Sequence, residues 1–173
     1  LMLQPSVSII TNIEEDHLIN YGNDFENLRQ AFLAFVKKLP FDGLLIACGD
    51  DPEIKKLLPQ CSRPNVTYGF EETNDYVISN YEPFEFRSNF LLTYAGQSIQ
   101  IDLNMLGRHN ALNASAACVL AIEEGINTSI IQGALKSFMG INRRMQVLGI
   151  MTVKDSNLIL IDDYGHHPSE IKN

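Results

Sequence analysis

The densest group of reactive side chains lies near the end of the sequence, directly after an apolar run. Residues 162–168 read Asp-Asp-Tyr-Gly-His-His-Pro, and residues 158–161 before them read Leu-Ile-Leu-Ile. A carboxylate at a strand end, here Asp163, can hold ribose hydroxyls, as acidic residues do in other nucleotide-binding folds. His166 and His167 could instead bind a metal ion, but the rest of a ligand set is not evident in the sequence. This segment is the strongest candidate for a functional site.

A second candidate segment opens a helix. Residues 107–113 read Gly-Arg-His-Asn-Ala-Leu-Asn, and the three-residue spacing of Asn110 and Asn113 puts both amides on one face of the first turn. Amide groups both donate and accept hydrogen bonds, which suits the edge of an adenine ring. A structural interpretation explains the residues equally well, because Asn is a common helix cap and Gly107 can simply make the turn.

Two further segments carry weaker signals. Residues 11–17, Thr-Asn-Ile-Glu-Glu-Asp-His, follow a predicted parallel strand, at the edge of the sheet where ligands bind in open α/β folds. His17 beside carboxylates could ligate a hard cation, although a solvated acidic loop is the simpler interpretation. The planar guanidinium of Arg143 or Arg144 could bridge ribose hydroxyls or phosphates, but paired Arg residues in a connection are more often surface charge.

The pattern of apolar residues predicts the elements that position these segments. An apolar run at 7–12, a helix capped by Asp24 and ending near Leu39, a strand at 44–48 and a short helix capped by Asp51 predict parallel strands joined by helices. Residues 66–105 alternate in the manner of antiparallel hairpins, with a turn at 95–97. Helices are expected at 110–124 and, capped by Thr128, at 129–138, before strands at 147–153 and 158–161, the last of them buried. The predicted fold class is α/β, with a mostly parallel sheet flanked by helices and a small antiparallel β-subdomain.

Composition narrows the function classes. The 173 residues carry a net charge of −8, which argues against a nucleic-acid-binding surface. The three cysteines form no CxxC pair and favour a reducing compartment, and no apolar run approaches the roughly 18 residues of a membrane span. We therefore expect a cytoplasmic protein with no membrane contact. The sequence contains no G-x-x-x-x-G-K-[ST] phosphate loop, so these residues alone should hold ATP poorly.

In their order and separations, four segments resemble those of the Mur ligase family. They are residues 11–17, residues 107–114 (Gly-Arg-His-Asn-Ala-Leu-Asn-Ala), the Arg-Arg pair before an apolar residue, and residues 162–168. The last is similar to the segment found in the family members that add L-alanine. The resemblance covers essentially the whole chain. It implies an ATP- and Mg²⁺-dependent ligase of peptidoglycan synthesis that joins L-alanine to UDP-N-acetylmuramic acid through an acyl phosphate.

The resemblance also implies roles for individual residues. His17 would ligate magnesium, and His17 and Arg144 would act in catalysis. The residues implied to contact nucleotide, at the adenine, ribose and phosphates, are His109, Asn110, Asn113, Arg144 and Asp163. Those implied to lie close to substrate are Tyr164, His166 and His167.

The same resemblance implies a division of the chain. Residues 1–145 would form the central ATP-binding domain without its N-terminal phosphate-loop part, and residues 146–173 would begin a truncated C-terminal Rossmann-like domain. On this interpretation we expect the fragment to be inactive alone. We also expect the cut sheet edge to promote self-association.

Three alternatives stay open at this point. The chain could be a non-catalytic module that binds adenine nucleotides. It could belong to the related ligase that recycles murein tripeptide, although Phe-Ala would be expected there in place of Tyr164-Gly165. It could also be a zinc hydrolase built on His17, His166 and His167, which would require three protein ligands and an open coordination position.

Overall fold

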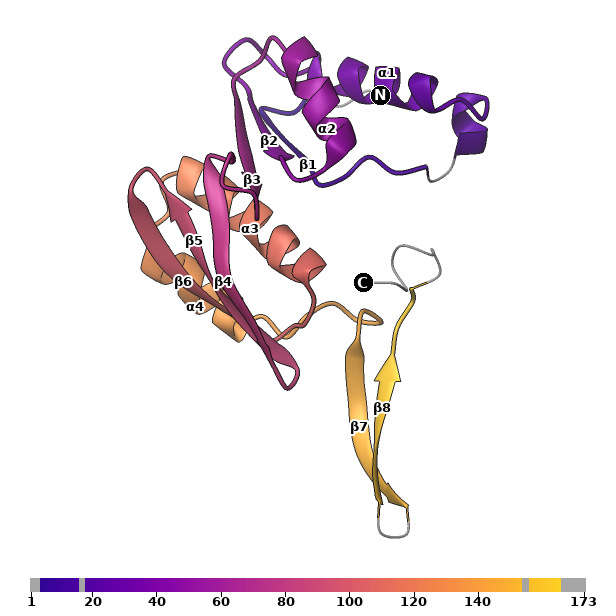
Figure 1. Ribbon diagram of the computed structural model, residues 1–173, viewed down its shortest axis with the longest axis vertical. Helices are drawn as coiled ribbons and strands as arrows, with labels where there is room; N and C mark the ends of the chain where they lie inside the picture. The colour runs from indigo at the N-terminus through magenta and orange to yellow at the C-terminus, as the bar shows by residue number, and fades with distance from the viewer. Residues whose placement is uncertain (1–3, 16–17, 154–155, 166–173) are drawn as a thin grey trace.

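The computed structural model describes residues 4–15, 18–153 and 156–165 (Figure 1). Its main sheet has six strands in the order β1-β2-β3-β4-β5-β6. Neighbours are parallel from β1 to β4 and antiparallel from β4 to β6. The strands are β1 (Val7–Ile10), β2 (Leu44–Cys48), β3 (Asn65–Gly69), β4 (Tyr76–Phe84), β5 (Arg87–Tyr94) and β6 (Gln97–Leu103). The predicted α/β class is confirmed.

The antiparallel part of the sheet begins later in the chain than predicted from the alternating apolar residues at 66–105. β3 lies within residues 66–105 almost entirely, yet it pairs in parallel with both of its neighbours. The antiparallel strands also continue the parallel sheet, so that β4 joins the two kinds of pairing. The predicted turn at residues 95–97 is confirmed between β5 and β6, where Ala95 and Gly96 have positive φ angles of 45° and 74°.

Four α-helices accompany the strands in the described residues. They are α1 (Phe25–Val36), α2 (Pro52–Leu57), α3 (Arg108–Glu123) and α4 (Thr128–Ser137), with short 3₁₀ turns at Leu18–Tyr21 and Leu58–Gln60. The predicted caps Asp24 and Asp51 are confirmed, because each carboxylate accepts a backbone N–H of the first turn. The cap of α4 was predicted wrongly. Asn127, not Thr128, has the extended backbone, and its side-chain oxygen accepts the Ser129 N–H at 2.9 Å.

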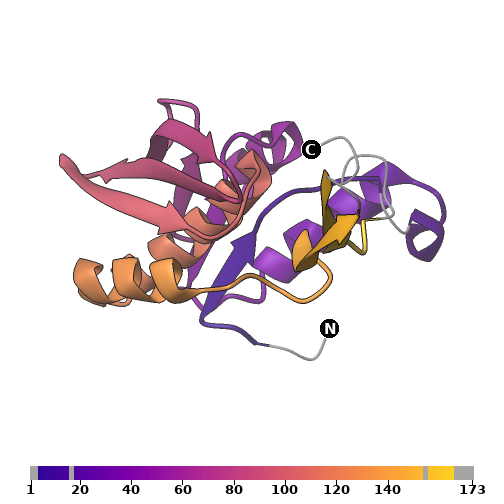
Figure 2. The same cartoon turned by 90° about the horizontal axis from the view of Figure 1, so that it is seen from below.

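α3 is the helix most closely packed on the sheet. It contacts β2, β3, β4 and β5, and α4 lies beside it against β6 (Figure 2). Its buried positions include Ala111, Ser115 and Ala116, whose small side chains let the helix backbone approach the strands. The sheet contributes the larger core side chains, such as Phe90 and Tyr68, both fully buried. This close packing fixes the N-terminal end of α3 relative to the strand ends.

The edge strand β1 is covered less than predicted. Ile10 is buried, but Ile9 is 38% exposed, although the apolar run suggested a strand covered on both faces. β2 flanks β1 on one side, and no strand in the described part of the chain pairs with its other side.

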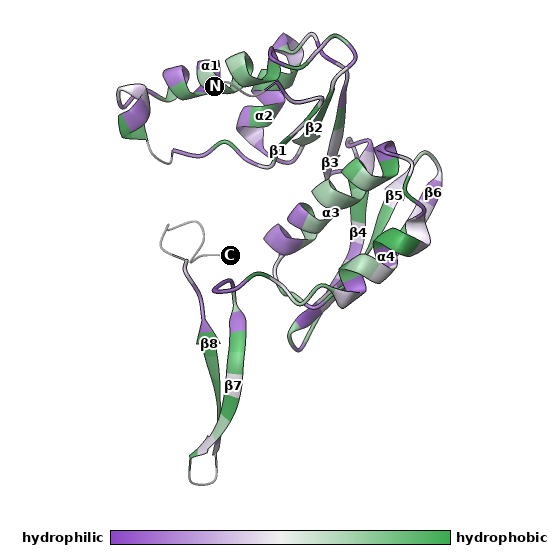
Figure 3. Cartoon of the chain, turned by 180° about the vertical axis from the view of Figure 1, so that it is seen from behind, coloured by the Kyte–Doolittle hydropathy of each residue, from purple (hydrophilic) through white to green (hydrophobic). Residues whose placement is uncertain are grey.

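The last two strands form a separate hairpin, β7 (Gln146–Val153) with β8 (Ser156–Asp162). It extends away from the main sheet and shows apolar residues along both strands (Figures 1 and 3). The predicted strand at 158–161 is confirmed, but the prediction that it is buried was wrong, since Leu158 is 52% and Leu160 55% exposed. Because the hairpin is a sheet of only two strands, neither of its faces is enclosed by another layer within the described residues.

Candidate functional site

The carboxyl ends of the parallel strands are tied together by two adjacent carboxylates after β2. Asp51 caps α2 by accepting the N–H groups of Glu53 and Ile54 through one oxygen. Its other oxygen accepts the Ile13 N–H at 3.3 Å, which connects the loop after β1 to the end of β2. The described part of the predicted segment, residues 11–15, is therefore anchored at the edge of the sheet where ligands bind in open α/β folds.

Asp50 makes the corresponding connection to the end of β3. Its half-buried carboxylate accepts the N–H groups of Phe70 at 2.7 Å and Glu71 at 3.1 Å, and the Asn74 side-chain amide at 3.0 Å. The contacts require glycine at position 69, where a Cβ atom would collide with the Asp50 carboxylate. Asp50 thus fixes the backbone that presents the Phe70 ring.

The N-terminal end of α3 lies over this edge. Gly107 has a φ of 96°, a conformation that favours glycine, and a Cβ atom there would force the imidazole of His109 to move. The Gly107 N–H donates to the Tyr81 hydroxyl of β4 at 3.0 Å. The Arg108 guanidinium lies 3.5 Å from the centroid of the Phe70 ring, in cation–π geometry. Strand ends and helix start are therefore held as one unit.

The two predicted amides lie on the first turns of α3. Asn110 is half-buried, and its side-chain nitrogen donates to the Leu106 carbonyl oxygen at 2.6 Å. Asn113 lies one turn further along and is exposed. Of the two, Asn110 therefore has the more fixed orientation.

Residues 140–146 and the residues after β8 are connected by hydrogen bonds to the Asp163 carboxylate and between backbone groups. Arg143 and Met145 have positive φ angles of 60° and 47°, an unfavourable conformation for residues with side chains. Asp163 accepts the Met145 N–H at 2.9 Å and the Gly165 N–H at 2.5 Å. The Tyr164 N–H donates to the Arg143 carbonyl at 2.7 Å. Asp163 therefore holds the turn that carries the arginine pair.

Electrostatic coupling joins this turn to α3. Burial lowers the pKa of His109, the negative charge of Asp163 raises it, and the positive charge of Arg144 lowers it, with burial the largest cause. Asp163 and Arg144, from two other predicted segments, therefore lie close enough to His109 to affect its pKa. An imidazole, a carboxylate and a guanidinium can together exchange hydrogen bonds with both the hydroxyl and the phosphate groups of a ligand.

The remaining predicted site residues are either exposed or outside the described part of the chain. Tyr164 is 53% exposed, and its ring lies 4.8 Å from the Arg143 guanidinium carbon. His17, His166 and His167 lie outside the described residues. Among the residues that are described, no group of three His, Cys, Asp or Glu side chains could hold a metal ion, and no helix is long and apolar enough to cross a membrane.

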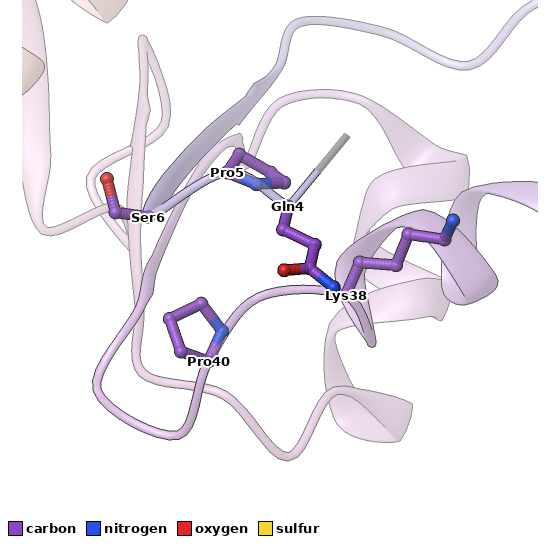
Figure 4. A pocket seen from close by; sticks show the side chains of 5 residues that line it. All are labelled: Gln4, Pro5, Ser6, Lys38 and Pro40. Atoms are coloured by element: carbon purple, nitrogen blue, oxygen red, sulfur yellow. The ribbon is translucent and has the colours of Figure 1, made fainter. Parts of the chain in front are cut away.

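A surface hollow lies at the other edge of the sheet, by the amino end of β1 (Figure 4). Its lining residues are Gln4, Pro5, Ser6, Lys38 and Pro40. Because these residues precede β1 or follow α1, the hollow is separated from the strand ends that carry the candidate site. We assign no function to it.

Sequence reasoning missed several residues of this edge. Asp50 and Phe70 directly follow two buried neighbouring strands, and that position was the available signal, because the carboxyl ends of parallel strands meet at one edge. Arg108 was recognised only as part of the 107–113 segment. Tyr81 carried no such signal, since its position depends on the pairing of β4 with β5.

Solved structures of Mur ligases share the fold of this chain. The UDP-N-acetylmuramate–alanine ligase MurC of Thermotoga maritima is 29% identical, with a TM-score of 0.81 over 98% of this chain and 37% of that one. MurF of Acinetobacter baumannii is 24% identical, with a TM-score of 0.81 over 98% and 36%. MurF ligase of T. maritima, solved in complex with ADP, is 19% identical, with a TM-score of 0.77 over 97% and 38%.

The chain thus spans little more than a third of the length of these solved structures. The sequence model described as the Mur ligase middle domain matches residues 1–121, which include the six-stranded sheet and most of α3. The chain therefore belongs to the Mur ligase middle domain family.

Proposed function

We propose that this chain forms the nucleotide-binding part of a cytoplasmic, ATP-dependent ligase that adds L-alanine to UDP-N-acetylmuramic acid. The proposal is supported by family membership and by the 29% identity with an alanine-adding ligase. It is also supported by the segment at 162–168, which is similar to that of the alanine-adding members. The single observation that carries it is that the turn with Arg143 and Arg144 is hydrogen-bonded to residues 163 and 164, which joins two of the predicted segments.

The donor set fits an adenine nucleotide. Asn110 and Asn113 offer amide groups to the base, and Arg144 offers a cation to ribose or phosphate oxygens. Both Asp163 oxygens already accept a backbone N–H, but each carboxylate oxygen has a second lone pair for a ribose hydroxyl. When bound, ATP supplies the phosphoryl group that activates a carboxylate for attack by an amine.

The magnesium ligand of the proposal is His17, which lies outside the described residues. The described part of its loop supports this proposal, because Ile13 is hydrogen-bonded to Asp51 at the end of β2, at the carboxyl edge of the sheet. Tyr164, His166 and His167 are proposed to lie close to the substrate. We assign catalytic roles to His17 and Arg144.

We also propose that a second domain begins at residue 146. The β7–β8 hairpin forms its own sheet, and its exposed apolar side chains require a further layer to cover them. The turns with positive φ at Gly140, Arg143 and Met145 precede it, as expected for a connection that sets the direction of a new unit. Residues 1–145 then constitute the central ATP-binding domain.

The test uses the protein encoded by the complete reading frame that contains this chain. Phosphate release is measured with ATP, Mg²⁺ and UDP-N-acetylmuramic acid, adding L-alanine or murein tripeptide. We expect release with L-alanine and a strong reduction in Arg144→Met. Arg87→Met is the matched control, because Arg87 lies exposed at the start of β5, in the hairpin away from α3.

The alternatives give different results in the same assay. Release with the tripeptide and not with L-alanine would identify the recycling ligase instead. ATP binding without phosphate release in either case would identify a non-catalytic nucleotide-binding module. Activity that requires zinc rather than magnesium would support the hydrolase alternative. Absence of any ATP binding would contradict the assignments at Asn110, Asn113, Arg144 and Asp163.

A further inference from the structure

β4 contains a β-bulge beside the start of α3. Ser79 pairs with Leu91, but the next pair is Glu82 with Asn89, so two residues of β4 face one residue of β5. Asn80, within the bulge, has a φ of 52°, which a short polar side chain tolerates better than most. The extra residue shifts the alternation of every side chain that follows it in β4.

The bulge decides which way Tyr81 points. Tyr76 faces α3, because its hydroxyl donates to Glu123 near the C-terminal end of that helix. Counted in steps of two from Tyr76, Tyr81 would lie on the opposite face of the sheet. The extra residue instead places Tyr81 on the α3 side, where its half-buried hydroxyl accepts the Gly107 N–H.

The peptide bond between Leu106 and Gly107 connects Tyr81 to Asn110. Its N–H donates to the Tyr81 hydroxyl at 3.0 Å, and its C=O accepts the Asn110 side-chain amide at 2.6 Å. A peptide unit is planar and rigid, so fixing its N–H also fixes the direction of its C=O. The Tyr81 hydroxyl therefore restrains the orientation of Asn110 through one rigid group.

The same contact determines which end of the Asn110 amide remains for a ligand. A carbonyl oxygen only accepts hydrogen bonds, so the group facing Leu106 must be the nitrogen of Asn110. Among the described residues, no donor reaches the remaining oxygen. A ligand group at this point must therefore be a hydrogen-bond donor, as the 6-amino group of adenine is. A 6-oxo purine presents an oxygen at that position and is disfavoured.

We propose that Tyr81 is a positioning residue that holds Asn110, through the Leu106–Gly107 peptide, as an acceptor selective for a 6-amino purine. The ligand part of this proposal rests on the proposed function. Neighbouring contacts keep Tyr81 in place, since its ring lies edge-on to Phe70 at 6.1 Å between centroids. Phe70 in turn carries the Arg108 guanidinium on its face. The hydroxyl therefore has little freedom to leave Gly107.

The first experiment requires no nucleotide. NMR hydrogen exchange of the Gly107 backbone amide and the Asn110 side-chain amide is compared between Tyr81→Phe and Tyr94→Phe. Tyr94 is the matched control, because it is half-buried on the neighbouring strand and stacks on Tyr76. Exchange at both sites should accelerate about fivefold in Tyr81→Phe alone, the ratio that one hydrogen bond supports. Unchanged exchange at Asn110 would overturn the proposal.

The second experiment measures the selectivity between ATP and inosine triphosphate in the protein of the complete reading frame. Tyr81→Phe should reduce the preference for ATP about fivefold, and it should have no further effect in an Asn110→Ala background. A purely structural role would weaken both nucleotides equally and would overturn the proposal. If the unaltered protein binds neither nucleotide, the proposed function fails, and hydrogen exchange alone then decides whether Tyr81 positions Asn110.

Discussion

Replacing Asp50 by alanine should clearly destabilise the protein. The carboxylate accepts three hydrogen bonds, and the bond from the half-buried Phe70 N–H is the shortest at 2.7 Å. Hydrogen bonds to a charged acceptor contribute about 1.5–3 kcal/mol, and exposed ones much less. Taking about 2 kcal/mol for Phe70 and less for Glu71 and Asn74, we expect a loss of about 3 kcal/mol.

Urea unfolding followed by far-ultraviolet circular dichroism measures this loss. With a denaturant slope of about 2 kcal/mol per molar, the midpoint of Asp50→Ala should fall by about 1.5 M. Asp50→Asn keeps one accepting oxygen, so about half of that shift is expected. Asp42→Ala serves as the control, because Asp42 is exposed in the loop before β2 and should change stability by less than about 0.5 kcal/mol.

The reasoning would be refuted by an Asp50→Ala midpoint within about 0.3 M of the Asp42→Ala midpoint at unchanged slope. In that case Phe70 and Asn74 would have to be held by their own strand and turn. The placement of the Phe70 ring under Arg108 would then need another cause.

Three further predictions concern separate parts of the molecule. The imidazole of His109 should titrate in an NMR experiment below the ordinary pKa of about 6.5, because burial lowers its pKa, and Asp163→Asn should lower it further by removing a negative charge. Since the folded pKa is depressed, the contribution of His109 to stability is present above about pH 6.5 and is lost as the pH falls through the folded pKa; a midpoint above 6.5 would contradict this. Asn127→Ala should cost about 1 kcal/mol in urea unfolding and Thr128→Ala clearly less, whereas the reverse order would restore Thr128 as the cap of α4. The chain should self-associate at high concentration through its exposed strands, and Ile150→Lys, at a side chain 68% exposed in β7, should reduce this in sedimentation velocity; a strictly monomeric chain would count against the idea.

The sequence alone was sufficient for several local features of this protein, although it placed the cap of α4 one residue too late. Asp24 and Asp51 were predicted as caps because capping depends on residues within one turn of each other. The strands and the parallel order of β1 and β2 followed from apolar runs and from the helix between them. Family resemblance depended on short segments, whose residues can be read without knowing where the segments meet.

Only the tertiary structure determined which distant residues lie close together and which apolar strands are exposed. Asp163 lies against the turn at 140–146 only because β7 and β8 pair and return the chain to that turn. The exposure of residues 158–161 could not be predicted, since an apolar run is the same whether or not another layer covers it. Tyr81 points to Gly107 because of one extra residue in β4, and a bulge is a property of two paired strands rather than of either sequence. The segments of the candidate site could be recognised in the sequence. Their arrangement in space depends on long-range pairing and packing, which no local pattern encodes.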